Sequence, residues 1–320
     1  MGRSSRMNDK RAETIKRKIS DTAFILSFTI VPVLSFLIFY VYVHLDSFVM
    51  AFQKPENGKL VFCGLENFTY VFDRIIHGST VETDNLQLAF INTFKTFGVQ
   101  VIMFPVGLFV SYFIYKKIWG YRTFRVLFYL PSIVSSVVTS FFFLELMSAS
   151  SFFPRILEKL YRLDYSLSNP LTDSDFANKM IFFNIIWMSF PGNLIIWGGT
   201  FSRIPDSVIE SARLDGVNSA QELFRIILPL VWPTLVLMVT LQVAGIFGAS
   251  GNVFLLTGGG YGTQTVSNWM YMKVLQSANP LGSRSLYQVS AMGLLLTVVS
   301  CIIAFFVRKF VASRVEEVTY

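Results

Sequence analysis

The residues Glu210-Ser211-Ala212-Arg213-Leu214-Asp215-Gly216-Val217 form a polar, amphipathic stretch, and a second landmark follows at Ile226-Ile227-Leu228-Pro229. Strongly apolar segments lie on both sides of this region of the chain. A loop of this kind on the cytoplasmic face of a membrane protein is suited to contact a partner outside the membrane. The stretch therefore predicts a membrane protein with a cytoplasmic contact surface.

The composition supports this interpretation over the whole chain. Of the 320 residues, 53% are hydrophobic and only 15% are charged, and 33 are phenylalanine. A soluble domain carries roughly 25% charged residues. The mean hydropathy of +0.53 is correspondingly high. We therefore expect a polytopic membrane protein rather than a soluble domain.

Six segments are long and apolar enough to cross a bilayer, which takes roughly 20 helical residues. They are 24–45, 88–115, 126–147, 180–201, 230–254 and 286–307. Long unbroken runs of this kind are helices, because a helix satisfies its own backbone groups in lipid. The alternating pattern of a membrane β-barrel is absent from the sequence. The predicted fold is all-α, with six transmembrane helices and a cytoplasmic helix–Gly–helix loop.

The basic residues predict the orientation of these helices. Seventeen lysines and arginines lie on the side of the chain that holds both termini and the 202–229 loop, and nine lie in the longer loops of the other side. Both termini and this loop are therefore expected in the cytoplasm. The net charge of +7 is explained by this bias and by anionic lipid headgroups, so no nucleic-acid partner is expected.

The chain divides into three parts. Residues 1–23 form a basic N-terminal tail, residues 24–310 form the transmembrane domain, and residues 311–320 form a C-terminal tail. The first apolar run is too long for a signal peptide and lacks a cleavage site, so we interpret it as an uncleaved span. Cys63 and Cys301 are not expected to form a disulfide.

Residues 202–229 are predicted to form two short helices separated by a sharp turn. Gly216 is placed where a left-handed residue ends a helix. Asn218 or Ser219 then begins the second helix, and Ser219 with Glu222 matches a capping box. A rigid, protruding elbow of this kind is suited to transmit motion between two bodies.

The elbow resembles the "EAA" loop of permease subunits of importers of the ATP-binding-cassette type. The matching residues are Glu210, Ala212, Asp215, Gly216, Ile226, Leu228 and Pro229, while Ser211 and Val217 replace alanines. Three further stretches resemble the sugar-type members of this family. They are Gly64-Leu65-Glu66-Asn67-Phe68, Arg122-Thr123-Phe124-Arg125 with Leu130-Pro131, and Leu256-Thr257-Gly258-Gly259-Gly260, in which Gly260 stands in place of proline.

This resemblance implies a six-helix permease subunit of an ATP-driven, binding-protein-dependent importer in a bacterial inner membrane. It implies a carbohydrate substrate, as in the maltose and glycerol-phosphate permeases. The implied partners are a second, related permease in a heterodimer, two ATPase subunits and an extracytoplasmic solute-binding protein. The residues implied to couple to the ATPase are Glu210, Ser211, Ala212, Asp215, Gly216, Leu228 and Pro229.

The sequence predicts no covalent chemistry and no bound cofactor. It contains no phosphate-binding loop of the pattern G-x-x-x-x-G-K-[ST], so ATP and magnesium are expected to bind the separate ATPase subunit. His44 and His77 are isolated and lack a partner at metal-ligand spacing. We therefore do not expect an enzyme or a metal site.

Polar side chains within the predicted spans suggest a substrate path, because they are costly when they face lipid. Amide groups can bond to sugar hydroxyls, and an indole ring can stack on a sugar. The path candidates are Ser135, Thr139, Asn184, Trp187 and Gln242. Hydrogen bonding between helices is the alternative role for each of them.

A secondary transporter without an ATPase is the alternative function. Such a protein needs an ion or proton site within the membrane. Only Lys95 and Glu145 are strongly ionisable residues within the spans, and both lie near span ends.

Overall fold

The computed structural model describes residues 22, 24–79, 84–162, 168–276 and 283–313. Almost all of the predicted N-terminal tail and most of the C-terminal tail lie outside these residues. The described part is helical apart from one two-stranded hairpin, which confirms the all-α class. The membrane-embedded elements are the helix Phe24–Ala51, which ends in α2 (Val43–Ala51), and α4 (Leu86–Tyr115), α5 (Tyr121–Ile133), α6 (Ser136–Leu146), α8 (Ala177–Phe201), α12 (Trp232–Ala244) and α15 (Arg284–Ala312).

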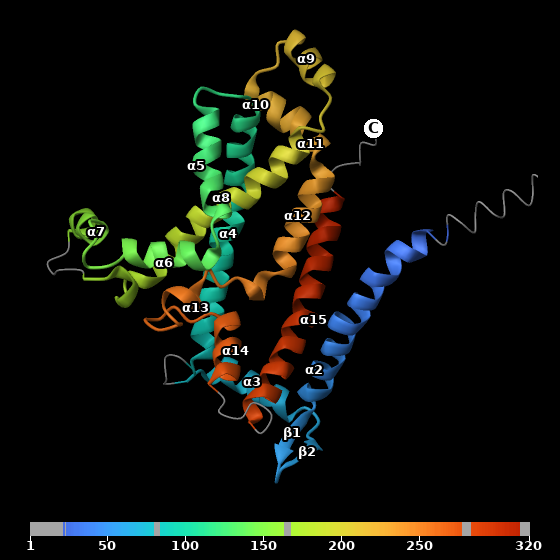
Figure 1. Cartoon of the computed structure of the whole chain (residues 1–320), viewed down its shortest axis with the longest axis vertical. Helices are drawn as coiled ribbons and strands as arrows, with labels where there is room; N and C mark the ends of the chain where they lie inside the picture. The colour runs from blue at the N-terminus through green and yellow to red at the C-terminus, as the bar shows by residue number, and fades with distance from the viewer. Residues whose placement is uncertain (1–21, 23, 80–83, 163–167, 277–282, 314–320) are drawn as a thin grey trace, which may run out of the picture.

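The remaining elements connect the membrane-embedded helices. One end of the molecule carries α9 (Asp206–Leu214), α10 (Ser219–Gln221), a π-helical turn (Glu222–Ile227) and α11 (Leu228–Leu230). The other elements are β1 (Gln53–Glu56), β2 (Lys59–Phe62), α3 (Glu66–His77), α7 (Phe153–Tyr161), a 3-10 turn (Pro170–Thr172), a 3-10 turn (Ile246–Gly248), α13 (Val253–Leu256) and α14 (Val266–Leu275). Figure 1 shows α9 and the β-hairpin at opposite ends of the molecule.

The described chain has four unbroken helices that are long and apolar enough to span a membrane. Two further spans are pairs of bent helices: α5 and α6 meet at 105°, and Ser219–Leu230 meets α12 at 75°. Counting each bent pair as one span gives the predicted number of six.

The third predicted span, 126–147, is wrong as a single straight helix. Val134 is extended, with φ −94° and ψ 144°, three residues after Pro131. Ser135 then begins a new helix, because its side chain accepts a hydrogen bond from the backbone N–H of Val137. Proline weakens the helical hydrogen-bond ladder, and the serine cap stabilises the new start.

The fifth predicted span, 230–254, extends about ten residues too far. Regular α-helix ends at Ala244, and Gly245 leads into the 3-10 turn. Apolar residues continue beyond this point, so hydrophobicity alone does not reveal the end of the helix. The irregular segment 245–252 crosses the middle of the molecule and later contributes to the candidate site.

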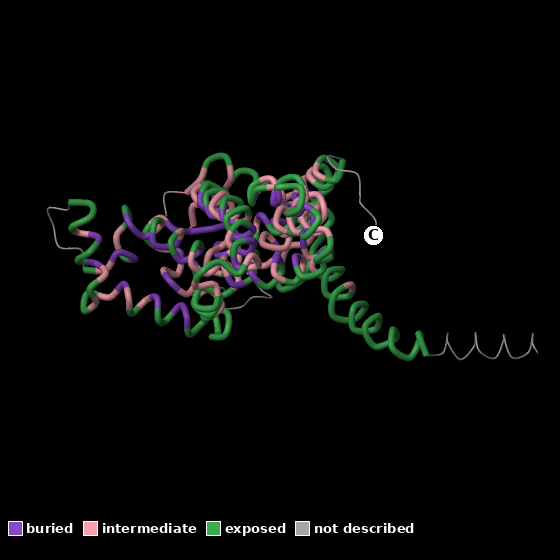
Figure 2. Tube along the Cα trace, turned by 90° about the horizontal axis from the view of Figure 1, so that it is seen from above, coloured by how far each residue is buried: buried purple, intermediate pink, exposed green. Residues whose placement is uncertain are grey.

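The helices pack in pairs. α4 packs along α8, α12 packs along α15, and α2 lies beside α15. None of the most apolar part of Phe24–Ala51 is buried, and Figure 2 shows this helix as an exposed arm. Its apolar side chains are suited to contact lipid, since they have few protein partners.

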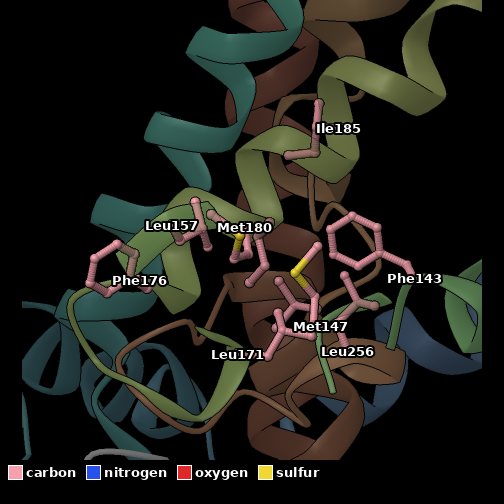
Figure 3. Packing of buried hydrophobic residues seen from close by; sticks show 10 residues of the cluster. Phe143, Met147, Leu157, Leu171, Phe176, Met180, Ile185 and Leu256 are labelled. Atoms are coloured by element: carbon pink, nitrogen blue, oxygen red, sulfur yellow. The ribbon is translucent and has the colours of Figure 1, made fainter. Parts of the chain in front are cut away.

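Buried apolar residues form three clusters along the molecule. One joins α6, α7, α8 and α13, and Figure 3 shows Phe143, Met147, Met180 and Leu256 packed together in it. A second lies beneath α9, and a third lies between α3, α4, α14 and α15. These clusters hold the irregular segments against the long helices.

The predicted Gly64–Phe68 motif anchors the hairpin end of the molecule. Asn67 is fully buried, and its side-chain N–H groups donate to the carbonyls of Ala51 and Gln53 at 3.0 and 2.8 Å. The amide therefore joins α3 to the end of the first span and to β1. Glu66 beside it bonds to Lys54 at 2.8 Å and to Arg284 of α15 at 2.6 Å.

Candidate functional site

The elbow at 202–229 has the predicted helix–Gly–helix form. α9 ends at Leu214 with Asp215 as its C-cap, and Gly216 has φ +76°, the left-handed conformation in which a Cβ atom is strained. The N–H of Val217 then donates to the carbonyl of Ala212, which closes the turn. The prediction for Gly216 is confirmed.

The side chains of α9 divide into an exposed and a buried set. Glu210, Ser211 and Asp215 are exposed, whereas Ile209 and Ala212 are buried against the bundle. Leu214 is 90% exposed, which is unusual for a large apolar side chain. The sequence analysis did not single out Leu214, although an apolar residue within a polar loop was the available signal.

The second helix of the elbow begins one residue earlier than the predicted capping box. Asn218 and Gln221 form the box: each side chain bonds to the backbone N–H of the other residue, at 2.9 and 3.1 Å. The proposed pair of Ser219 and Glu222 is therefore wrong. Glu222 does not cap the helix because its side chain turns inward to a different partner.

Glu222 is a buried anion that ties the elbow to α4. Its carboxylate accepts a bond from Lys116 Nζ at 2.7 Å and from the hydroxyl of Tyr112 at 3.2 Å. The glutamate side chain is only 2% exposed, so this pairing is required for its burial as an ion. Sequence reasoning missed this contact because the partners lie on a distant helix.

The elbow also rests on an apolar base. Ile209, Leu223 and Ile227 pack in one cluster with Trp197 and Phe201 of α8. Leu228 is partly buried against the same cluster, and Pro229 follows it in α11. Leu228 and Pro229 thus lie at the base of the elbow, where they help to orient it, and not on its exposed tip.

A cavity of about 660 Å³ lies deeper in the bundle. It is lined by α4, α8, α12 and the irregular segment that follows α12. Its polar side chains are four amides from helices, one amide from the segment and two hydroxyls: Gln100, Asn184, Asn193, Gln242, Asn252, Ser189 and Ser250. Its apolar lining includes Phe104, Ile185, Met188, Ile196, Met238 and Leu241.

Two of the predicted path residues line this cavity. Asn184 and Gln242 lie on its wall, and the Asn184 side chain is 2% exposed and makes no hydrogen bond to any residue in the described ranges. A buried amide without a protein partner is available to a bound molecule or to water. The transport path itself remains a prediction.

The other three path candidates do not line the cavity. Trp187 packs against α6, with ring centroids 6.3 Å from Phe142 and 6.4 Å from Phe143. Ser135 caps α6, and the hydroxyl of Thr139 donates to the carbonyl of Ser136 at 3.0 Å. These contacts fit the packing alternative, because each side chain already has its partner in α6.

Gln100 and Asn252 line the cavity but were missed from the sequence. Gln100 lies halfway along α4 and is a polar residue within a long apolar span, which was a usable signal. Asn252 lies in the irregular segment with φ +58°, a conformation that no local pattern predicted.

The cavity can bind an uncharged, hydroxylated molecule. Amides and hydroxyls both donate and accept hydrogen bonds, and the methionines and Phe104 provide apolar surface. Its lining residues include no charged side chain. Among the residues placed by the structure, no group of three His, Cys, Asp or Glu side chains could hold a metal ion.

An aromatic block connects the cavity to the elbow. Phe104 lines the cavity, and its ring lies 5.6 Å from that of Trp197. Trp197 stacks on Phe201 at 6.0 Å, and both belong to the cluster beneath α9. These rings form a continuous packed connection between the cavity wall and the base of the elbow.

Several relatives have matching sequences or folds. The arabinooligosaccharides transport system permease protein AraP of Bacillus subtilis (strain 168) is 25% identical over 69% of this chain and 67% of its own length. The maltose/maltodextrin transport system permease protein MalF of Klebsiella aerogenes is 28% identical over 65% of this chain, which spans only 40% of that protein. A chain from the crystal structure of a bacterial alginate ABC transporter, in complex with an alginate pentasaccharide-bound periplasmic protein, has a TM-score of 0.72 at 20% identity. That match covers 93% of this chain and 96% of the other.

The family model of the binding-protein-dependent transport system inner membrane component matches residues 103–317. This region contains the elbow, the cavity-lining parts of α8 and α12, and the aromatic block. The chain is a multi-pass membrane protein that belongs to the family of binding-protein-dependent transport system inner membrane components.

Proposed function

We propose that this chain forms one half of the translocation pathway of an ATP-driven importer for a neutral oligosaccharide. The observation that carries the proposal is the uncharged, amide-lined cavity of about 660 Å³, joined by the aromatic block to a rigid elbow. In this proposal the elbow moves with the ATPase subunit that it contacts, and the cavity binds a polar solute.

The nature of the solute follows from the lining of the cavity and from the relatives. Five amides and two hydroxyls offer many hydrogen bonds, as a sugar with several hydroxyl groups requires. The absence of lysine and arginine from this lining favours a neutral sugar over an acidic one, because a buried carboxylate needs a cationic partner. AraP and MalF are named for arabinooligosaccharides and for maltose and maltodextrin.

The partners follow from the family. We place the chain in a heterodimer with a second permease, served by two ATPase subunits and an extracytoplasmic solute-binding protein. ATP and magnesium bind the ATPase subunits, and the permease carries out no covalent chemistry. Both termini and the elbow lie in the cytoplasm of a bacterium, and no nucleic acid takes part.

The elbow is the ATPase contact in this proposal. Glu210, Asp215 and the exposed Leu214 meet the ATPase, while the buried face of α9 rests on the cluster around Trp197. Closure of the ATPase dimer moves α9 as a rigid body. The complex then shifts between the inward-facing and outward-facing states of the cavity, because the ATPase subunits bind ATP more tightly in one of these states.

Reconstitution of the complete complex tests this function. The permease pair, ATPase and binding protein are placed in liposomes, and ATP-dependent uptake of arabinotetraose, maltotetraose and an alginate tetrasaccharide is measured. Uptake of a neutral tetrasaccharide without uptake of alginate is expected. ATP-independent uptake that stops with a proton ionophore would support the secondary transporter, which none of the comparisons favours.

A further inference from the structure

A second, smaller cavity of about 280 Å³ lies between α13 and α14. It shares Ser250 and Asn252 with the central cavity, so the two cavities are adjacent and this segment lies between them. Figure 1 shows α9 at one end of the molecule, α13 near the middle and α14 towards the hairpin. The small cavity therefore lies beside the central cavity, on its hairpin side.

Four of the polar side chains that line this cavity have no hydrogen-bond partner among the described residues. The side chains of Ser250, Asn252, Ser267 and Tyr271 make no hydrogen bond to another residue within the ranges that the structure describes. By contrast, the hydroxyls of Ser189 and Thr240 on the nearby helices donate to carbonyls of their own helix. The hydrogen-bonding groups of these four side chains are therefore available to a ligand or to water.

An aromatic pair forms the apolar side of the cavity. The rings of Phe254 and Tyr271 meet edge to face, with centroids 4.7 Å apart. The two residues are 42% and 49% exposed, so each keeps free ring surface. Ring surface beside hydrogen-bonding groups suits a sugar ring, which has apolar C–H faces and a polar rim.

The segment between the two cavities contains two residues with a left-handed backbone. Asn252 has φ +58° and Gly251 has φ +55°, and only glycine adopts this region without steric cost. A Cβ atom on Gly251 would lie 2.6 Å from the side chain of Ile185, so α8 holds this segment closely. A non-glycine residue in this region, here Asn252, persists when the surrounding packing fixes it, and such residues cluster at ligand sites.

Contact with lipid does not explain the polar side chains that line the smaller cavity. Polar side chains that face lipid are costly and are expected to face a cavity or another chain instead. Asn268 on the same wall is 3% exposed, and its side-chain N–H group donates to the carbonyl of Gly258 at 3.2 Å. The wall is therefore fixed by the Gly258–Gly260 loop, which gives the site a rigid frame.

We propose that this cavity is a second sugar subsite, which binds the next residue of a neutral oligosaccharide while the central cavity holds the first. The inference rests on the proposed function. Tyr271 and Phe254 stack on the sugar ring, and Ser250, Asn252 and Ser267 bond to its hydroxyls. The subsite selects for chain length, because a disaccharide in the central cavity does not reach it.

The test compares two chain lengths in the reconstituted complex. Maximal uptake rates of maltotetraose and maltose, and of arabinotetraose and arabinobiose, are measured at sugar concentrations that saturate the binding protein. Differences between variants then arise in the permease. Tyr271→Ala is expected to lower the ratio of tetrasaccharide to disaccharide rate about tenfold, which corresponds to ~1.4 kcal/mol.

Matched variants separate this effect from a general defect. Tyr261 lies in the segment between α13 and α14, is 43% exposed and lines neither cavity, so the ratio in Tyr261→Ala stays at the wild-type value. Gln100→Ala alters the central cavity alone and slows both sugars alike. Tyr271→Phe and Ser267→Ala are milder changes, and each is expected to lower the ratio less than Tyr271→Ala. They test the subsite if Tyr271→Ala disturbs assembly of the complex.

The outcomes are distinct. An unchanged ratio in Tyr271→Ala, Tyr271→Phe and Ser267→Ala overturns the subsite, as does an equal loss for both chain lengths in all three. Failure of the wild-type complex to take up any of the four sugars overturns the proposed function, and the subsite with it. A lowered ratio in the Tyr271 and Ser267 variants alone establishes the subsite.

Discussion

Lys116 Nζ lies 2.7 Å from Oε2 of Glu222, and this ion pair joins two segments that are 106 residues apart in the chain. Lys116 directly follows the C-terminal end of α4, whereas Glu222 begins the π-helical turn of the elbow. Gln100 and Phe104 of the same α4 line the central cavity. The pair therefore fixes the elbow to a helix that reaches the cavity.

Replacement of Glu222 by alanine is expected to weaken both stability and coupling. The Lys116 ammonium loses its acceptor, at a cost of about 1–3 kcal/mol because one fifth of that side chain still reaches solvent. The amount of sugar taken up per ATP hydrolysed is expected to fall, because without the ion pair the elbow can move separately from α4. Thermal unfolding of the purified complex and the ratio of uptake to ATP hydrolysis measure the two effects.

Two variants control this prediction. Arg225→Met removes an exposed charge from the same elbow and leaves both quantities unchanged. The exchange of Lys116→Glu with Glu222→Lys restores part of the coupling ratio, because the two charges can pair again. A normal ratio in Glu222→Ala at wild-type membrane levels contradicts the prediction.

The tip of the elbow is predicted to hold the ATPase. Glu210→Ala removes an exposed charge, and Leu214→Ala removes the 90% exposed apolar side chain. Gly216→Val adds a strain of about 1 kcal/mol or more, because φ +76° disfavours a Cβ atom. Each change lowers ATP hydrolysis stimulated by the loaded binding protein. Ser219→Ala, an exposed change outside the tip, retains normal stimulation, and full stimulation in the triple variant would count against the contact.

Alanine substitutions at Asn184 and Trp187, which are neighbours on α8, are expected to have different effects on uptake and on stability. Asn184→Ala removes an amide from the cavity wall and slows uptake while the complex assembles normally. Trp187→Ala instead removes a ring packed on α6, so the complex unfolds at lower temperature, with a loss of about 1–3 kcal/mol for this partly buried side chain. Uptake rates and unfolding temperatures are measured for both variants. The assignment fails if Asn184→Ala destabilises the complex and Trp187→Ala only slows uptake.

The orientation is tested with single cysteines in a chain that carries Cys63→Ser and Cys301→Ser. Leu65→Cys lies by the hairpin at a 64% exposed position, and Trp119→Cys lies near the elbow at a 95% exposed position. A membrane-impermeant maleimide added to intact cells is expected to label the first and not the second. Permeabilised cells serve as the control, in which both react. Labelling of Trp119→Cys in intact cells reverses the topology.

The ion cluster around Glu66 predicts a pH dependence at the hairpin. Hydrogen bonds from Lys54 and Arg284 lower the pKa of Glu66 below its ordinary value of about 4.3. A lowered pKa means that the carboxylate stabilises the folded state above its ordinary pKa, and that this contribution disappears as pH falls through the folded pKa. The cluster is therefore intact at neutral pH and is lost only in strong acid.

Glu66→Gln provides the matched comparison. At pH 7 the amides of 53–62 are expected to exchange hydrogen faster in Glu66→Gln than in the wild type, because Arg284 and Lys54 lose the anion that anchors the hairpin. The difference disappears as pH falls through the lowered pKa of Glu66, which lies below the ordinary value of about 4.3. Comparing the two proteins at each pH removes the intrinsic pH dependence of exchange. A difference that persists unchanged at low pH contradicts the assignment of Glu66 as the titrating group.

Local patterns were sufficient for several features. The long apolar segments predicted the membrane-spanning helices, because a span is defined by length and hydropathy over about 20 consecutive residues. Gly216 was identified as the end of α9, since a left-handed residue depends on its own φ and on the preceding turn. The elbow was identified from residues that lie close together in the sequence.

Other features depended on contacts between distant segments. Asn184 and Trp187 both appeared as polar residues of one helix, but only their neighbours on α4, α6 and α12 decide that one faces the cavity and the other packs on Phe143. Glu222 resembled a capping residue until Lys116 of another segment was placed beside it.

The sequence alone thus determined the class of protein, the number of spans and the position of the elbow, because these depend on composition and on local backbone preferences. Tertiary structure alone decided the bends within two spans, the lining of the cavities and the partner of Glu222. The physical reason is that the direction of a side chain and its pairing depend on packing between helices, and residues many positions apart meet only when the bundle has formed.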